Sequence, residues 1–433
     1  MNKRILRLAI PNILSNLAIP LQGIVDTALM GHLEDEVYIG AIGLGATLFA
    51  IIYWGLGFIR MGTTGLVAQA YGRQDQNTVT LTLFRALGVA LLAAAIVLLF
   101  RQGIVTLAFD YMIDGEADTE RLAGEYFFSR VLAAPAALSL FAFKGWFLGM
   151  QNARFPLILT LAVTLSNIVF SFWFVEGMGM TSDGVAYGTL CAQYIGLATC
   201  LVLLRIRYLK ELLWVKKIKQ EIFEVKALRH FFSINSDIFL RTLALTFAFT
   251  FFDVKSAEAG NTTLAVNKIL NQMLFLISYG VDGFAFAAES IVGRYVGSKE
   301  GDKLRKAIRL LMIWGMGLGA VFSLVYAVGG TWILRVFTSQ EHLLEAAYLY
   351  LPWMILLPLL SSAAFLWDGI YIGAVATRTL LYMMLLSTFV VFLPVYYISF
   401  PLWENHGLWL AMSAFMLSRS LFLSIMAKKV IYF

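Results

Sequence analysis

The stretch Pro20-Leu-Gln-Gly-Ile-Val-Asp26-Thr-Ala-Leu-Met-Gly31 lies near the end of the first apolar run of the chain, residues 5–30. The run is long enough to cross a bilayer, where a central carboxylate costs about 2.5–3.5 kcal/mol on insertion scales. A proline inside a helix removes a backbone donor and bends the helix. We therefore expect a bent membrane-spanning helix with Asp26 facing an internal, water-reachable cavity. The alternative is an Asp26 that lies near the outer interface of the bilayer and merely contacts water.

The composition indicates a membrane protein. Of the 433 residues, 60% are hydrophobic and only 14% are charged, which is too few charges to cover a soluble protein of this size. Twelve apolar segments are long enough to cross about 30 Å of hydrocarbon, and they lie approximately at residues 5–30, 38–70, 81–101, 122–149, 156–176, 184–208, 231–253, 264–295, 306–328, 343–373, 378–400 and 405–427. The expected fold class is therefore an all-α polytopic membrane protein with twelve transmembrane helices.

The distribution of charge predicts the orientation of the chain. Lysines and arginines gather before the first segment and after the even-numbered segments, with the largest group between residues 205 and 229. The opposite connections carry the acids Glu34, Asp35, Glu36, Asp110, Asp114, Glu116, Asp118 and Glu120. The positive-inside rule then places both termini in the cytoplasm of a multi-pass protein of the inner (plasma) membrane. These loops account for the net charge of +6, so we expect no nucleic-acid partner.

Two pairs of matching sequences indicate a duplicated chain. Gly65-Leu-Val-Ala-Gln-Ala-Tyr-Gly72 closes the second segment, and Ser290-Ile-Val-Gly-Arg-Tyr-Val-Gly297 closes the eighth, 225 residues later. Gly145-Trp-Phe-Leu-Gly149 matches Gly369-Ile-Tyr-Ile-Gly373 at an offset of 224. Six segments separate the copies, so both halves cross the membrane in the same sense, as a parallel repeat with a pseudo-two-fold along the membrane normal.

The repeat predicts the domain organisation. We expect an N-terminal six-helix lobe at residues 1–209, a cytoplasmic linker at 210–229 and a C-terminal six-helix lobe at 230–433. The linker has apolar residues at helical spacing, namely Trp214, Ile218, Ile222 and Val225. This spacing favours an amphipathic helix along the membrane interface, and a plain solvated connector is the alternative.

Several polar side chains lie within the apolar segments, where facing lipid would be costly. They are Asn16, Gln22, Asp26, Arg60, Lys144, Asn167, Ser171 and Thr189 in the first half, and Asp237, Arg241, Asn271, Gln272, Asp282, Glu289 and Asp368 in the second. Asn167 and Ser171 are one helical turn apart and share a face. Asp237 and Arg241 have the same spacing, so an ion pair that holds two helices together explains them as well as a functional role does. Glu289 is near the expected cytoplasmic mouth, where solvation would explain it, whereas Asp282 and Asp368 lie in apolar runs with glycine.

The sequence carries no signature of a soluble enzyme. It lacks the GxxxxGK[ST] loop, so direct drive by ATP is unsupported. The four histidines are scattered, so no metal site is expected, and the two cysteines are expected to be packing residues. An ion gradient remains as the energy source, since one charge that falls through 100 mV yields about 2.3 kcal/mol. We expect no enzyme activity and no cofactor beyond a coupling ion, H⁺ or Na⁺.

These motifs together resemble the multidrug and toxic compound extrusion (MATE) family. The resemblance rests on the prolines followed by Asp26-Thr-Ala-Leu-Met-Gly31-His, on Gln69-Ala-Tyr-Gly72 with Arg294-Tyr-Val-Gly297, and on the six-plus-six arrangement. Phe239-Leu-Arg241, Tyr279-Gly-Val-Asp282-Gly-Phe and Trp367-Asp368-Gly resemble its DinF subfamily. The resemblance implies a V-shaped pair of six-helix lobes around a central cavity. It also implies multidrug efflux, in which organic cations or amphiphilic drugs leave in exchange for inward H⁺ or Na⁺.

The resemblance implies roles for individual residues. Asp26 corresponds to the proton-linked acid of the family's first span, and Asp368 to an acid of its tenth span. Pro11 corresponds to the kink-forming proline, with Pro20 as an additional break. Asn167 and Ser171 match an Asn and an Asp one turn apart, so a hydroxyl replaces the second acid here and more weight falls on Asp26.

The resulting expectation is a proton-coupled antiporter that works as a monomer. The coupling residues would be Asp26, Asn167, Ser171, Thr189, Asp282, Glu289 and Asp368, and the substrate cavity would include Gln22, Arg60, Lys144, Asp237 and Arg241. Protonation of Asp26 would let the first helix bend further at Pro11 or Pro20 and so expel the substrate. Two alternatives remain: a lipid-linked oligosaccharide flippase of a related fold, which would need a ring of unpaired cations, and a non-transporting membrane assembly or sensor protein.

Overall fold

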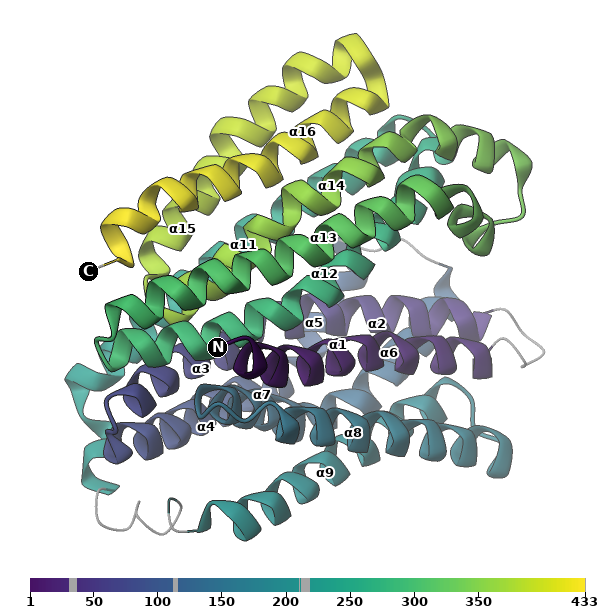
Figure 1. The fold of residues 1–433 in the computed structure, drawn as a ribbon. Coiled ribbons are helices and arrows are strands. Elements are labelled where there is room, and N and C mark those ends of the chain that lie inside the picture. Colours follow the sequence, from purple (N-terminus) through teal and green to yellow (C-terminus); the bar gives the residue numbers. More distant parts are fainter. Residues whose placement is uncertain (31–36, 112–115, 210, 212–218, 433) are drawn as a thin grey trace. The chain divides into compact units, whose positions relative to one another are not determined.

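The computed structural model describes residues 1–30, 37–111, 116–209, 211 and 219–432. These residues are almost entirely helical, and none of them belongs to a β-strand (Figure 1). The expected linker helix falls largely outside the described residues, as do Gly31, Glu34, Asp35, Glu36 and Asp114. Of the linker, the structure describes a short 3₁₀ helix, η3, at Lys219–Phe223.

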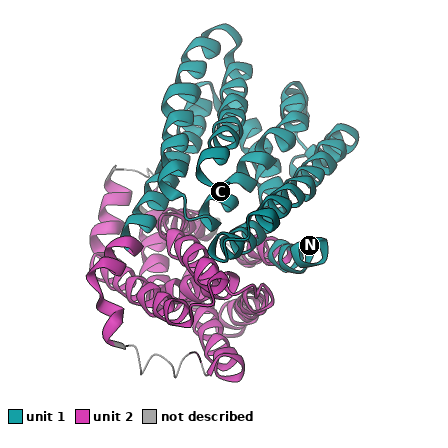
Figure 2. Cartoon of the chain, turned by 60° about the vertical axis from the view of Figure 1, so that its left-hand side comes forward, with its two compact units in different colours: residues 1–13, 232–433 teal, residues 14–231 magenta. Residues whose placement is uncertain are grey.

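The chain divides into two compact units (Figure 2). Unit 2 comprises Leu14–Phe231, and unit 1 comprises Met1–Ile13 together with Phe232–Phe433. The first 13 residues are thus grouped with the C-terminal helices, whereas we expected them in the N-terminal lobe. Contacts within unit 1 give the reason: Arg4 Nη1 donates to the hydroxyl of Tyr295 at 3.2 Å, and Gly283 lies against the backbone of Ile13.

The helices of unit 2 begin with most of α1 (Asn2–Met30). They continue with α2 (Val37–Leu56), α3 (Phe58–Gly72), α4 (Gln76–Leu99), α5 (Arg101–Tyr111), α6 (Ala117–Arg130), η1 (Val131–Ala133), α7 (Ala134–Gly149), α8 (Arg154–Phe172), η2 (Trp173–Gly177) and α9 (Ser182–Arg207). Unit 1 contains most of α11 (Val225–Glu258), then α12 (Asn261–Gly297), α13 (Gly301–Phe337), α14 (Glu341–Gly373), α15 (Thr377–Leu386), η4 (Ser387–Phe392) and α16 (Leu393–Val430).

Ten of the described helical stretches are long and apolar enough to cross a membrane. The segment expected at 231–253 lies in α11, which is not one of the ten. The last two expected segments lie in one stretch, Thr377–Val430, but the backbone leaves the helical conformation between them at Glu404 (φ 48°, ψ −127°). The expected all-α membrane fold is confirmed. α1 runs as one helix through both Pro11 and Pro20.

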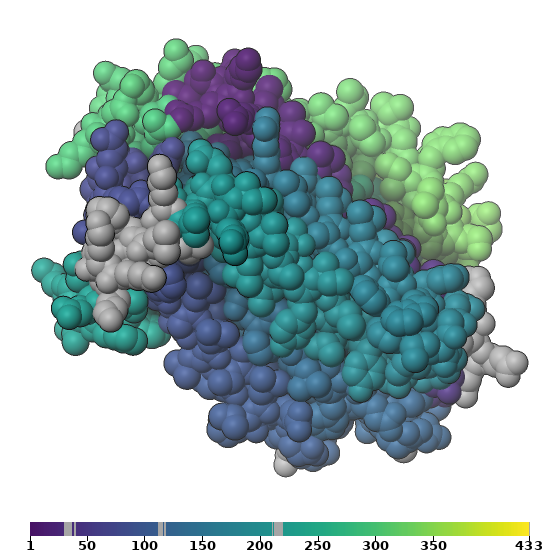
Figure 3. Space-filling view, turned by 90° about the horizontal axis from the view of Figure 1, so that it is seen from below, coloured from purple at the N-terminus to yellow at the C-terminus, as the bar shows by residue number. Residues whose placement is uncertain are grey.

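Large apolar side chains are exposed in rows along several helices. In α8, Leu161, Leu165 and Val169 are 41%, 61% and 64% exposed, and their spacing of four residues places them on one face. Residues of unit 2, coloured blue to teal, cover most of the face seen in Figure 3. Soluble monomers rarely expose contiguous apolar surface of this kind, whereas in a bilayer such rows face the acyl chains of lipids.

Four turns of the same conformation mark the duplication. Gln74, Gln151, Lys299 and Val375 have φ of 59°, 64°, 57° and 56°, values uncommon for residues other than glycine. Each donates its backbone N–H to the carbonyl three residues earlier, at 2.9–3.2 Å. Gln74 and Lys299 are 225 residues apart, and Gln151 and Val375 are 224 apart, which are the offsets of the sequence repeat. The backbone therefore supports the duplication that the motifs predict.

The repeated glycine pairs bring helices into backbone contact. A Cβ on Gly149 of α7 would be 3.0 Å from the carbonyl oxygen of Thr64 on α3. A Cβ on Gly373 of α14 would be 2.5 Å from the backbone carbonyl oxygen of Glu289 on α12. Small residues one turn apart allow this approach between membrane helices, so the same helix crossing occurs once in each unit.

Candidate functional site

Asp26 begins a chain of buried hydrogen bonds within unit 2. The hydroxyl of Ser171 on α8 donates to Asp26 Oδ1 at 3.4 Å. Asn167, one turn earlier on α8, donates from Nδ2 to Ser171 Oγ (3.3 Å) and to Thr189 Oγ1 on α9 (3.0 Å). Asp26 is 5% exposed, and the other three side chains are at most 2% exposed. The structure thus brings together four of the seven residues that we expected to couple the ion. The burial of Asp26 contradicts the alternative in which it merely contacts water.

A glycine on α9 allows this arrangement. A Cβ on Gly188, the residue before Thr189, would lie 2.7 Å from the backbone nitrogen of Ser171 and 2.9 Å from its Cα. Real Cβ atoms essentially never come so close. Only glycine therefore lets α9 lie close enough to α8 for Thr189 to reach Asn167.

The site offers oxygen atoms to a small cation. The acceptors are the Asp26 carboxylate, the hydroxyls of Ser171 and Thr189, and Asn167 Oδ1, which is buried without a hydrogen-bond partner among the described residues. Oxygen ligands suit hard cations, and the carboxylate can bind a proton. No group of three His, Cys, Asp or Glu side chains that could hold a metal ion occurs in the described parts of the chain.

Arg130 adds a positive charge that sequence reasoning missed. It is the last residue of α6, its Nη1 donates to the hydroxyl of Tyr126, and its charge acts on Asp26. The available signal was an arginine inside the apolar run 122–149. Nothing in the local sequence connects it to Asp26, because the two lie on different helices.

Unit 1 contains a second buried charge cluster. Asp368 Oδ2 on α14 accepts from Arg241 Nη2 on α11 and from Arg419 Nη2 on α16, the latter at 2.6 Å. The three residues are 8%, 5% and 1% exposed. An ion pair of Arg241 with Asp237 was one of two interpretations of their spacing, but the guanidinium of Arg241 pairs with the carboxylate of Asp368 instead. Arg419 is a further residue that sequence reasoning missed.

Three further predicted acids of unit 1 make no ion pair with Arg241 or Arg419 that is seen among the described residues. Asp237 Oδ2 accepts from the Thr377 hydroxyl at 2.9 Å, and Asp282 Oδ2 accepts from the Ser278 hydroxyl at 3.0 Å. The charge of Asp282 also acts on Arg419. Glu289 is 1% exposed, so solvation at a mouth does not explain it and that expectation was wrong.

The remaining predicted residues of the first half are spread over three helices. Arg60 of α3 and Lys144 of α7 lie near each other, where the charge of Arg60 acts on Lys144. Gln22 is half-buried on α1, one turn before Asp26. Pro11 and Pro20 are both half-buried in α1. The residues expected to line one substrate cavity are therefore divided between the two units.

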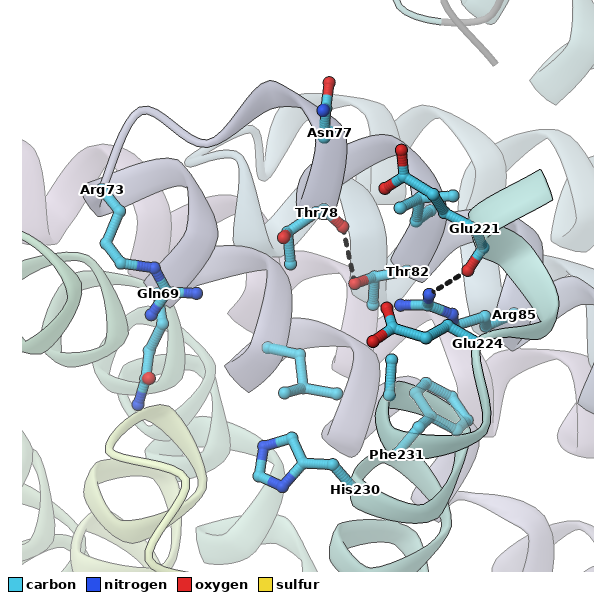
Figure 4. Close-up of a pocket in the computed structure, with 13 residues that line it drawn as sticks. Gln69, Arg73, Asn77, Thr78, Thr82, Arg85, Glu221, Glu224, His230 and Phe231 are labelled. Carbon is cyan, nitrogen blue, oxygen red and sulfur yellow. Dashed lines mark hydrogen bonds between the residues drawn. The ribbon is translucent and has the colours of Figure 1, made fainter. Parts of the chain in front are cut away.

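A polar pocket of about 240 Å³ lies elsewhere in unit 2, between α3, α4 and η3. Figure 4 shows Arg73 and Gln69 on one side of it, and Arg85, Glu221 and Glu224 on the other. Arg85 donates from Nη2 to the carbonyl of Glu221 (2.6 Å) and from Nε to that of Ile222 (3.0 Å). Arg85 thus fastens η3 to α4, which is a structural role.

Comparisons with known proteins cover most of the chain. A family model described as MatE matches residues 11–173 and 238–398. The chain is 35% identical to the DNA damage-inducible protein F of Escherichia coli (strain K12), over 98% of this chain and 91% of that protein. It is 25% identical to the probable multidrug resistance protein NorM of Synechocystis sp., over 75% of this chain and 70% of that protein. The Vibrio cholerae MATE transporter VcmN in its bent form has a TM-score of 0.86 at 17% identity, covering 99% of this chain and 96% of that one.

Proposed function

The chain belongs to the MatE family of multidrug and toxic compound efflux transporters, and from that premise we propose that it is a secondary antiporter, which exports organic cations or amphiphilic drugs in exchange for inward protons. It is a multi-pass membrane transporter rather than an enzyme. The positive-inside pattern supports a location in the inner membrane with both termini in the cytoplasm. We expect the monomer to be the functional unit.

The observation that carries the proposal is the burial of Asp26 at the end of a hydrogen-bonded chain. The carboxylate is 5% exposed and accepts a hydrogen bond from Ser171, which Asn167 holds in place. An intramembrane acid in such a position is a functional-site hypothesis by default. Asp368 supports the choice by contrast, because its direct ion pairs with Arg241 and Arg419 leave it less free to exchange a proton.

The proposed cycle alternates two states of Asp26. The ionised carboxylate accepts from Ser171 or pairs with a cationic substrate, and protonation from outside removes its charge. Protonated Asp26 no longer attracts the substrate, and α1 then bends further at Pro11 or Pro20, where a proline leaves a carbonyl of the helix without its donor. Loss of the proton to the cytoplasm returns the site to its first state. Asp282, Glu289 and Asp368 are secondary candidates for coupling.

Sodium is the alternative coupling ion. The Asp26 carboxylate and the oxygens of Ser171, Thr189 and Asn167 would suit it, and Asn167 Oδ1 has no hydrogen-bond partner within the described part of the chain. The flippase alternative needs unpaired cations, and Arg241 is paired with Asp368. We therefore propose the drug antiporter, with H⁺ before Na⁺.

The test reconstitutes the purified protein in vesicles and follows ethidium efflux under H⁺ and Na⁺ gradients imposed separately. Asp26→Asn should reduce gradient-driven efflux to the level of empty vesicles, because it cannot exchange a proton. Asp118→Asn is the matched control, since Asp118 is an exposed acid in the same unit. Undiminished efflux by Asp26→Asn would contradict proton coupling through this acid. Efflux that a Na⁺ gradient drives and a H⁺ gradient does not would identify Na⁺ as the coupling ion.

A further inference from the structure

Arg130, whose positive charge acts on Asp26, is packed against aromatic rings. The guanidinium carbon of Arg130 lies 4.6 Å from the ring centre of Phe49 on α2 and 5.5 Å from that of Tyr126 on α6. Leu29, three residues after Asp26 on α1, packs in the same apolar cluster as these two rings. Asp26 and Arg130 therefore belong to one packed region of unit 2, in which the charge of each acts on the other.

This cation makes contacts that do not involve Asp26. Its Nη1 donates to the hydroxyl of Tyr126, and the rings of Phe49 and Tyr126 are 2% and 1% exposed. Gly45 of α2 leaves room for the Tyr126 ring, since a Cβ there would be 3.0 Å from Tyr126 Cε1. Tyr126 and Phe49 thus give the guanidinium contacts of its own besides the charge of Asp26.

Asp26 and Asp368, two of the buried acids, differ in how they meet arginine. Asp368 accepts hydrogen bonds directly from two guanidiniums. The hydrogen bond to Asp26 comes from Ser171, at a long 3.4 Å, while Arg130 bonds to Tyr126. An isolated carboxylate is costly to bury, and one long hydrogen bond from a hydroxyl group offsets only part of that cost. A positive charge at longer range lowers the cost of burying the ionised carboxylate and leaves its oxygens available to bind a proton.

We propose that Arg130 is the built-in counter-cation of Asp26, a positioning residue that stabilises the empty, ionised carboxylate and so allows it to release its proton. This inference rests on the proposed function, in which Asp26 exchanges the proton. Arginine suits the task because its planar guanidinium lies flat on aromatic faces and always carries its charge. Without it, Asp26 would retain its proton and the exchange cycle would stop.

The test measures proton-driven ethidium efflux from vesicles that contain the full-length protein. Arg130→Ala removes the charge, Arg130→Lys retains it, and Arg101→Ala removes a matched arginine that lies 5.8 Å over the ring of Phe128 in the same unit. We expect the initial rate to fall about ten-fold or more in Arg130→Ala, which is the scale on which a nearby opposite charge changes the ionisation of a carboxyl. Arg130→Lys should retain most of the rate, and Arg101→Ala all of it. Added methylguanidinium should restore part of the efflux of Arg130→Ala, whereas methylammonium should not.

A double-mutant cycle distinguishes a role of Arg130 as the counter-ion of Asp26 from a purely structural role in packing. Arg130→Ala should lower the melting temperature when Asp26 is present and much less in the Asp26→Asn background, because the charge then has no partner. Equal losses in both backgrounds, wild-type efflux by Arg130→Ala, or efflux by Arg130→Lys as low as that of Asp26→Asn would overturn the inference. If Asp26→Asn is inactive while Arg130→Ala is active, the inference fails and the proposed function stands. An active Asp26→Asn contradicts the proposed function itself.

Discussion

At the scale of the residue, the site in unit 2 combines one acid with one neutral donor. Ser171 is fully buried, donates to Asp26 and accepts from Asn167. A second carboxylate at position 171 would place two like charges within hydrogen-bond range, which raises the cost of ionising either one. The hydroxyl avoids this repulsion, so the proposed proton exchange rests on Asp26.

Removal of the Ser171 hydroxyl should therefore slow proton-driven efflux. Ser171→Ala deletes the donor to Asp26 and one acceptor of Asn167, and the loss of a hydrogen bond to a charged group costs about 1.5–3 kcal/mol. We expect the initial efflux rate to fall about ten-fold, since ~1.4 kcal/mol corresponds to a factor of ten. Ser139→Ala is the control, because Ser139 is also buried in unit 2, on α7. Equal rates for the two variants would show that the hydroxyl plays no part.

The residues around Asp26 differ in how far the sequence could predict them. Asp26, Asn167, Ser171 and Thr189 are polar groups inside apolar runs, and the resemblance to a known family implied roles for the first three. Arg130 and Arg419 also lie inside apolar runs, but an arginine there carries no local sign of its partner. Arg419 bonds to an acid 51 residues earlier in the chain, and only the packing of α14 against α16 brings the two together.

At the scale of the element, close helix contacts fix the geometry of the site. Gly188 places α9 against the backbone of Ser171, and Gly149 and Gly373 do the same for their own helix pairs. The apolar runs predicted most of the helices, because a membrane span needs a long apolar stretch that is visible in the sequence. The four turns with positive φ could not be predicted in this way, since residues such as Gln74 and Val375 seldom adopt that conformation.

A methyl group at position 188 should disturb both packing and function. Gly188→Ala would force α9 away from Ser171, and overpacking of a close contact typically costs about 1–3 kcal/mol. We expect a lower melting temperature and slower efflux, because Thr189 would lose its reach to Asn167. Gly88→Ala on α4 is the matched control: a Cβ there meets nothing within 4 Å, and alanine favours a helix by about 1 kcal/mol over glycine. A melting temperature of Gly188→Ala that matches or exceeds that of Gly88→Ala would contradict the tight contact.

At the scale of the whole molecule, α1 is one of two described helices whose residues fall in both units, and α11 is the other. The residues of α1 up to Ile13 belong to unit 1, and those from Leu14, including Asp26, belong to unit 2. Pro11 precedes this division and Pro20 follows it, and both lie inside the unbroken helix. A change at Asp26 therefore acts on a helix that is also anchored in the other unit, and the prolines are the points at which its backbone hydrogen bonding is incomplete.

The last prediction concerns these prolines, because they should separate stability from function. Pro20→Ala restores a helical hydrogen bond and should raise the melting temperature, since proline costs about 3 kcal/mol relative to alanine in a helix interior. Efflux should nevertheless fall, because a stiffer α1 no longer bends when Asp26 binds its proton. Pro352→Ala is the matched control, an interior proline of α14 whose loss should leave efflux unchanged. If Pro20→Ala is stabilised and still exports ethidium at the wild-type rate, bending at Pro20 is not needed to couple the proton to export, whereas reduced efflux in both variants would point to a general need for flexible helices.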